Sequence, residues 1–146
     1  MSMTEGTQSR TSFRLHQVRA IADFLEQRHQ SFRQHYEFMV TVEGDRAGFC
    51  GLNIESQEFK RASIAYGYLP KVWGNGIGTE AADRLMQFGF DRLGLVRIQA
   101  TAHPDNIASH RVAEHIGMKY EGRLSKYAFA HNEWRDSLLF ACTIDD

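Results

Sequence analysis

The sequence predicts an α+β protein in which mostly antiparallel strands pack against helices. Apolar residues alternate with polar ones in several segments before residue 70 and again near the C-terminal end. Between these groups, two helical patterns flank one short strand pattern. No internal repeat, low-complexity tract or linker interrupts the 146 residues, so a single domain over residues 1–146 is expected.

The first half of the chain is predicted to hold one helix and three strands. Residues 1–10 are polar and are expected to be disordered. A helix is predicted over 11–34, because Leu15, Val18, Ala22 and Leu25 recur there at helical spacing. Strands are predicted over 38–42, 47–54 and 62–68, with a hairpin turn at 43–46 and a polar loop at 55–61.

The second half is predicted to hold two helices and three strands. The main helix covers about 78–93, and a later helix begins at Pro104-Asp105-Asn106 and ends at Gly117, a residue type common just past helix ends. Strands are predicted over 97–101, 119–130 and 134–144, the last two around a His131-Asn132 turn.

Composition excludes several classes of protein. A net charge of −1 and a pI of about 6.7 give no argument for nucleic acid or an anionic membrane. No apolar run approaches the roughly 20 residues of a membrane-spanning helix, and the polar N-terminus is unlike a signal peptide, so a cytoplasmic protein is expected. Cys50 and Cys142 lie in apolar strand patterns and are expected to be free thiols rather than a disulfide.

The sequence lacks the motifs of metal sites, of nucleophilic hydrolases and of Walker-type nucleotide-binding loops. The seven histidines contain no HExxH and no pair at i,i+4, so no metal site is expected. The sequence has no GxSxG for nucleophilic hydrolysis. Its glycine-rich turn lacks the Lys-Ser/Thr ending of a Walker loop.

That glycine-rich turn, within LPKVWGNGIGTEAA (residues 69–82), is the most informative segment. It leads from a strand into a helix, where backbone N–H groups and the helix dipole together attract phosphate. Gly74, Gly76 and Gly78 let the backbone approach a ligand that a Cβ would block. Taken alone, a tight turn without a ligand explains the pattern nearly as well.

A second segment, HPDNIASHRVAEHIGMKYEGRL (residues 103–124), follows at a fixed spacing. Together the two segments resemble the GCN5-related N-acetyltransferases (GNAT), in particular the RimJ/RimL-like ribosomal-protein branch. The matching residues are Trp73-Gly74, Gly76, Glu80-Ala81, Asn106, Ser109, Gly117 and Glu121-Gly122. The likeness runs from about Glu37 to the C-terminus, and it implies a GNAT-type sheet with helices on both faces and acetyl-CoA as co-substrate.

The resemblance also implies which residues hold acetyl-CoA. The turn of Trp73 to Thr79 would bind the pyrophosphate, pantetheine would lie along the end of the third strand, and a backbone N–H of Gly67 to Leu69 would bond the thioester oxygen. The implied cofactor-binding residues are Tyr68, Leu69, Trp73, Gly74, Asn75, Gly76, Ile77, Gly78, Thr79, Asn106 and Ser109. Trp73 can instead be a packing residue, and Asn106 can be a helix N-cap.

Catalytic residues are less well defined by the resemblance. Many relatives use a tyrosine where this chain has Ala113, which leaves Ser109, ranked first, and Tyr127 as proton donors to the leaving sulfur. Ser109 can also be a small packing residue. The two positions of the family's glutamate base fall at Ala65 and Ala128. The remaining candidates for the base are Glu55, Glu58, His103 and His131, each more typical of a solvated surface group. We therefore expect water to relay the proton from the amine. Glu121 is expected to have a structural role.

The start of the chain lacks one feature of that branch. Relatives begin with a strand, whereas Phe13-Arg14-Leu15 is too short and too helical to form it, so an open sheet edge or a shortened chain is expected. The final strand is apolar on both faces. We therefore expect a homodimer through this strand or through the first-helix edge, with a monomer in which residues 2–13 supply the missing strand as the alternative.

The function expected from these residues is acetyl-CoA-dependent N-acetyl transfer to a primary amine. The acceptor is a protein N-terminus, a polyamine or another small-molecule amine. The alternative is a non-catalytic acyl-CoA-binding module, which the alanines at positions 65 and 128 favour. A purely structural interaction domain, with no affinity for CoA, is the third reading.

Overall fold

The computed structural model describes residues 33–70, 74 and 76–145. Several predictions fall outside this part of the chain and stay predictions. They concern the disorder of residues 1–10, the helix over most of 11–34, the missing first strand, and the positions of Trp73 and Asn75.

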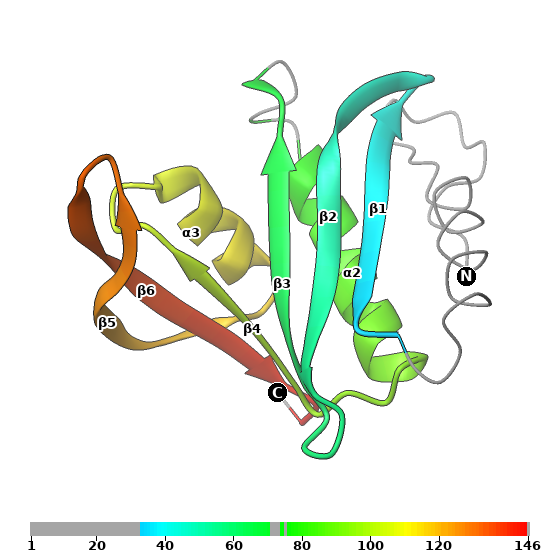
Figure 1. Cartoon of the computed structure of the whole chain (residues 1–146). Helices are drawn as coiled ribbons and strands as arrows, with labels where there is room; N and C mark the ends of the chain where they lie inside the picture. The colour runs from blue at the N-terminus through cyan, green and yellow to red at the C-terminus, as the bar shows by residue number, and fades with distance from the viewer. Residues whose placement is uncertain (1–32, 71–73, 75, 146) are drawn as a thin grey trace.

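The described residues form six strands and two helices, in the order predicted from the sequence (Figure 1). The elements are β1 (His35–Val42), β2 (Asp45–Ser56), β3 (Arg61–Tyr68), α2 (Ile77–Asp91), β4 (Arg97–Ala102), α3 (Ile107–His115), β5 (Lys119–Ala130) and β6 (Glu133–Thr143). The bounds lie close to the predicted ones. The largest difference is at β1, which begins at His35 rather than Phe38.

All six strands belong to one sheet, in the order β1-β2-β3-β4-β6-β5. Every neighbouring pair is antiparallel except β3 and β4, which run parallel. This is the mixed, mostly antiparallel α+β sheet that the sequence predicts. The parallel pair is connected through α2, as parallel neighbours require a crossover.

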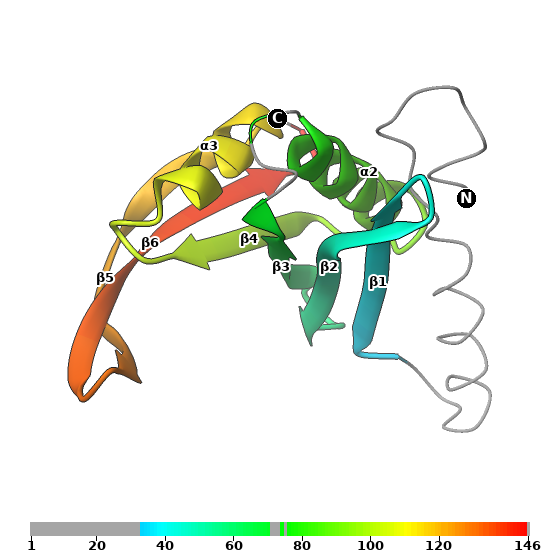
Figure 2. The ribbon, with the colours of Figure 1, turned by 90° about the horizontal axis from the view of Figure 1, so that it is seen from above.

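Both described helices lie on the same face of this sheet (Figure 2). Tyr66 and Tyr68, two residues apart on β3, contact α3 and α2 respectively, so the two helices share the face to which both side chains point. The apolar side of α2 packs on β2 and β3 and forms the core with fully buried Leu52, Leu85 and Ile98. Most of the helix predicted over 11–34 falls outside the described residues, so the implied placement of helices on both faces stays a prediction.

The position of β6 contradicts one prediction. β6 pairs with β4 on one side and with β5 on the other, so it lies inside the sheet and cannot supply an open edge. Its two apolar faces have a different cause. Phe140 on the helix side is 4% exposed and Ala141 on the other side is 2% exposed, as expected for an inner strand covered by neighbours.

Other sequence-based expectations can be compared with the described residues. Cys50 and Cys142 are free thiols, and burial raises the pKa of Cys50 to about 12, which keeps it protonated and unreactive. Neither of the described helices is long and apolar enough to cross a bilayer. Within the same residues, no three His, Cys, Asp or Glu side chains gather closely enough to hold a metal ion.

Candidate functional site

The two parallel strands β3 and β4 separate soon after they meet. Only Arg61, Ala62 and Ser63 pair with β4, and beyond Ser63 the two strands diverge, as the splayed ribbons in Figure 1 show. A cleft of about 390 Å³ opens in the gap. It is lined by Glu55, Ser63, Ile64, Ala65, Tyr66, Gln99, Ala100, Thr101, Ala102, His103, Asn106, Ser109 and Tyr127.

The lining residues come from both faces of the sheet. Successive side chains of a strand point to opposite faces, so Tyr66 faces the helices whereas Ser63 and Ala65 face the other side, here called the open side because neither of the described helices lies on it. On β4, Ala100 is buried under the helices and Gln99 and Thr101 face the other way. The cleft therefore connects the helix side of the sheet with its open side, which is the arrangement needed when two substrates approach from opposite directions.

Two tyrosines tie the end of β3 to the helices beside the cleft. The hydroxyl of Tyr66 donates to the backbone carbonyl of Ser109 over 3.0 Å, and that of Tyr68 donates to the carbonyl of Gly78 over 3.1 Å. Their rings stack with an interplanar angle of 15°. Burial raises the pKa of Tyr66 to about 12 and raises that of Tyr68 further, so both hydroxyls remain protonated donors at neutral pH.

The anion site predicted from the glycine-rich turn lies at the start of α2. Its N-cap, Gly76, lies in the left-handed region at φ 83° and offers no side-chain cap. The first bond inside the helix runs from the N–H of Glu80 to the carbonyl of Gly76. A Cβ on Gly78 would lie 2.7 Å from the Tyr68 ring. Glycine at this position therefore lets the Tyr68 ring pack against α2, in addition to letting a ligand approach the backbone. Gly74 and Thr79 belong to the same segment, and Ile77 is buried beneath it.

The backbone bonds of β3 reduce the number of N–H groups that can donate to the thioester oxygen. Of the three residues 67–69, Leu69 donates its N–H to the carbonyl of Ala47 over 2.8 Å, which removes it from the prediction. Gly67 lies two residues before Leu69 and is opposite Phe49, so by the alternation of an antiparallel pair its N–H also points to β2. The alternation directs the backbone groups of Tyr66 and Tyr68 away from β2, toward the cleft.

Asn106 and Ser109 meet at the start of α3, on the cleft wall. The side-chain Oδ1 of Asn106 accepts the N–H of Ser109 over 3.2 Å, so the N-cap reading of Asn106 is confirmed. Its amide NH₂ remains a donor beside the cleft. The Ser109 side chain is half-buried and lines the cleft, while its backbone is held at both its N–H and its carbonyl.

The structure divides the four candidates for the base into two pairs. Glu55 and His103 line the cleft, whereas Glu58 and His131 do not. Nδ1 of His103 accepts the N–H of Asp105 over 3.0 Å, so the proton of the neutral imidazole lies on Nε2 and the ring offers no free lone pair. Glu55 is thereby left as the one acidic group among the lining residues.

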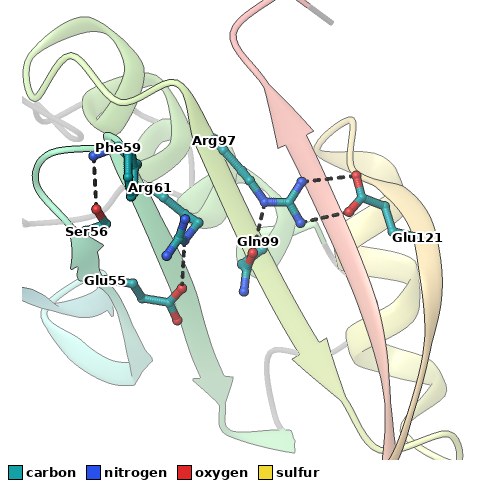
Figure 3. Close-up of polar contacts among 7 residues, drawn as sticks. All are labelled: Glu55, Ser56, Phe59, Arg61, Arg97, Gln99 and Glu121. Carbon is teal, nitrogen blue, oxygen red and sulfur yellow. Dashed lines mark hydrogen bonds and ion pairs between the residues drawn. The ribbon is translucent and has the colours of Figure 1, made fainter.

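The open side of the sheet next to the cleft carries a polar network (Figure 3). Arg97 donates two bonds to the carboxylate of Glu121, over 2.8 and 3.2 Å, and a third from Nε to Gln99 over 2.9 Å. Arg61 lies 3.7 Å from Glu55. The bidentate pair fits the structural role predicted for Glu121, because its carboxylate joins β5 to β4 and Glu121 is not among the residues that line the cleft.

Sequence reasoning missed the residues of the open side, Ser63, Gln99 and Thr101. Alternation could have placed each on the face of its strand, but not beside the other strand. The two alanines at the family's glutamate positions differ in their surroundings. Ala65 lines the cleft, and Ala128 does not.

Comparison with known proteins gives one family. A model of the acetyltransferase (GNAT) domain matches residues 6–119. YoaA, an uncharacterized N-acetyltransferase of Bacillus subtilis, is 33% identical over 94 residues, which cover 64% of this chain and 53% of that protein. Spermidine N(1)-acetyltransferase of Escherichia coli is 25% identical over 114 residues, covering 78% of this chain and 61% of that protein.

A solved structure extends the likeness to the three-dimensional fold. RimJ of Mycobacterium smegmatis, in complex with CoA-disulfide, superposes with a TM-score of 0.75 at 30% identity, covering 88% of this chain and 61% of that one. The chain thus spans little more than half the length of these proteins. The activities of these longer proteins are therefore only proposed for this chain.

Proposed function

The chain belongs to the GNAT acetyltransferase domain family, and on this premise we propose that it transfers the acetyl group of acetyl-CoA to a primary amine. The observation that carries the proposal is the divergence of β3 and β4, which opens a cleft through the sheet. One substrate can enter on the helix side and the other on the open side. Their reacting atoms then meet inside the gap.

The described residues fit the co-substrate. At the start of α2, Gly76 supplies a left-handed backbone turn without a side-chain cap, and among the described residues outside its immediate chain neighbours no atom lies within 4 Å of where its Cβ would stand. Helix N–H groups there suit a pyrophosphate. Along β3, the backbone groups of Tyr66 directed away from β2 suit the amides of pantetheine, and the Asn106 NH₂ can donate to one of them.

Acetyl-CoA supplies the activated acetyl thioester. Ser109 is the proposed proton donor to the departing sulfur, because its hydroxyl lies on the cleft wall while both of its backbone groups are held. Glu55 faces the open side, where it can hold the ammonium form of the acceptor or receive its proton through water. Tyr127 is the second candidate for the donor.

The acceptor is proposed to be an α-amine of a peptide or a polyamine. The RimJ/RimL-like likeness of the two sequence motifs favours the peptide, and a fold shared with the RimJ structure is in line with it. The spermidine enzyme among the relatives favours the polyamine. Open-side groups Ser63, Gln99 and Thr101 would contact either acceptor.

The decisive experiment is an acceptor panel. Purified protein is mixed with acetyl-CoA and, separately, with spermidine, a lysine derivative or a short peptide with a free α-amine. Release of CoA thiol and the mass of the acetylated product are measured. Thiol release that depends on an amine supports the transferase.

Two negative outcomes lead to different conclusions. If no amine releases thiol but acetyl-CoA still raises the melting temperature, the chain is the non-catalytic acyl-CoA-binding module. If acetyl-CoA changes neither, the cofactor assignment is wrong. Hydrolysis of acetyl-CoA without an amine is the background to be subtracted.

We also propose a homodimer, but with an interface that does not use β6. With β6 inside the sheet, the edge strands of the described part are β1 and β5. β5 carries two register shifts, which make a poor edge for pairing with a second strand. Pairing through the β1 side therefore remains, and light scattering at micromolar concentration decides between a dimer and a monomer.

A further inference from the structure

The β5–β6 hairpin contains a bulge next to the cleft. Leu124 pairs with Ser137, and Ala128 pairs with Arg135. Residues 125–127 of β5 therefore face only Asp136 of β6. Within the bulge Lys126 adopts a left-handed backbone at φ 50°, a conformation that an ordinary residue holds only when its surroundings impose it.

The carboxylate of Asp136 replaces the ladder partner that the bulge removes. Its Oδ1 accepts the backbone N–H of Lys126 over 2.9 Å, and its Oδ2 accepts Nε of Arg123 over 2.7 Å. These two bonds hold the pKa of Asp136 below its ordinary value, the larger effect coming from the Lys126 N–H. At neutral pH the group is therefore ionised and accepts at both oxygens.

Tyr127, directly after Lys126, lines the cleft although two strands, β4 and β6, separate β5 from β3 in the sheet. Its ring is 54% exposed. Among the described residues its hydroxyl has no hydrogen-bond partner, so the backbone of the bulge determines where the ring lies. The curled hairpin in Figure 2 shows how β5 bends back toward the rest of the sheet.

We propose that Asp136 is a positioning residue, which fixes the β5 bulge through Lys126 and Arg123 and thereby holds Tyr127 at the cleft. The kinetic meaning of this inference rests on the proposed acetyl transfer. Its structural meaning does not, because the position of Tyr127 can be measured without turnover. Asp136 itself touches neither substrate.

The position of Tyr127 is measured by ¹⁹F NMR on protein labelled with 3-fluorotyrosine. The chain has five tyrosines, and the resonance missing from Tyr127→Phe identifies this one. Without ligand, Asp136→Ala should raise the solvent isotope shift of this resonance to that of a fully exposed ring. Arg123→Ala, which keeps the Lys126 contact, should have a smaller effect.

Asp83→Ala is the matched control. Asp83 is also a surface carboxylate that accepts a side-chain bond, from Gln87 over 3.0 Å, but it lies on α2 outside the cleft lining. It should leave the Tyr127 resonance unchanged. Equal isotope shifts in Asp136→Ala and the wild type overturn the proposal, whatever the protein catalyses. If Asp136→Ala fails to fold, Asp136→Asn is used, which keeps one acceptor oxygen.

A double-mutant cycle adds the functional readout. Asp136→Ala should lower kcat/KM about fivefold or more in the wild-type background and leave it nearly unchanged in the Tyr127→Ala background, because neighbouring residues that act together are not additive. Equal losses in both backgrounds would show that Asp136 acts without Tyr127 and contradict the inference. A chain without transferase activity would contradict the proposed function, while the ¹⁹F result would still decide the role of Asp136.

Discussion

The hydroxyl of Tyr66 donates a hydrogen bond to the backbone carbonyl of Ser109, 3.0 Å away and 43 residues later in the chain. This contact joins the diverging end of β3 to the first turn of α3 across the helix side of the cleft. It fixes the backbone of the proposed proton donor from one side, while Asn106 holds it from the other. The following predictions test this arrangement and its neighbours.

Tyr66→Phe removes the bond and leaves the Ser109 carbonyl without its donor. We expect the free energy of unfolding to fall by about 1 kcal/mol, as for one half-buried hydrogen bond. The pKa of Tyr66 is raised to about 12 from 10.0. The unfolded chain therefore loses its proton first, and the stability present below pH 10 should decline between pH 10 and 12, less steeply in the variant.

Urea denaturation at several pH values measures this effect. Tyr120→Phe is the control, since it removes the hydroxyl of a tyrosine that is 57% exposed. If the free energy of unfolding declines equally steeply between pH 10 and 12 in Tyr66→Phe and in the wild type, the prediction is wrong.

Ser109→Ala removes the proposed proton donor but keeps both backbone bonds of residue 109. We expect kcat to fall at least about tenfold while the affinity for acetyl-CoA stays nearly the same. Steady-state kinetics combined with calorimetric binding of acetyl-CoA separates the two quantities. Unaltered turnover would move the role to Tyr127 or to water.

Gly76→Glu should abolish the binding of acetyl-CoA by placing a negative charge where the pyrophosphate is expected. Gly76→Asn is the matched control, because asparagine tolerates the left-handed backbone at φ 83° and adds no charge. In the part of the chain that the structure describes, no atom outside the two chain neighbours lies within 4 Å of the Cβ position. At acetyl-CoA a hundredfold above its Kd, the wild type and the control should gain about 2.7 kcal/mol of stability.

Thermal melts with and without acetyl-CoA measure this gain. A gain of the same size in Gly76→Glu would show that the start of α2 does not hold the pyrophosphate. A loss of binding in both variants would assign the effect to the backbone rather than to the charge.

Glu121→Gln should weaken the fold without affecting the chemistry. The bidentate bond to Arg97 is partly exposed, so its loss should lower the free energy of unfolding by about 1 kcal/mol or less and more so at low salt. Glu80→Gln, which breaks a 3.6 Å pair with Arg84 on the surface of α2, should cost less. A tenfold drop in kcat with unchanged stability would contradict the structural role.

The pH dependence of the reaction tests whether a side chain removes the proton from the amine. With alanine at both of the family's glutamate positions, we expect kcat/KM to rise with pH around the pKa of each amine and not around the pKa of a group of the enzyme. Glu55→Gln should then raise KM for the amine and leave the shape of the profile unchanged. A basic limb that disappears in Glu55→Gln would identify Glu55 as the base.

Local sequence patterns predicted most of what is local in this fold. Alternation and helical spacing predicted the strands and helices with bounds close to those observed, since each depends on neighbours within a few residues. The N-cap, one of the two roles predicted for Asn106, is local in the same way, because its bond to Ser109 spans three residues. The glycines before α2 were predicted to form a tight turn or a site of close ligand approach, and Gly74 and Gly76 have the left-handed backbone of such a turn.

The neighbours of each strand were decided by the tertiary structure. Two apolar faces on β6 led to the prediction that this strand is covered in a homodimer, yet β6 pairs with β4 and β5 inside the sheet of a single chain. Periodicity shows which side chains share a face but not which strand lies alongside. The divergence of β3 from β4 after Ser63, which opens the cleft, depends on such long-range pairing.

The sequence by itself therefore determined the order of the elements, the glycine turn and the residues at the start of α3. Only the tertiary structure brought Tyr127 to the cleft, occupied the N–H of Leu69 with Ala47, and separated Glu55 and His103 from Glu58 and His131. The physical reason is distance along the chain. Contacts between residues far apart in sequence are specified by the packing of the whole sheet, which no local pattern records.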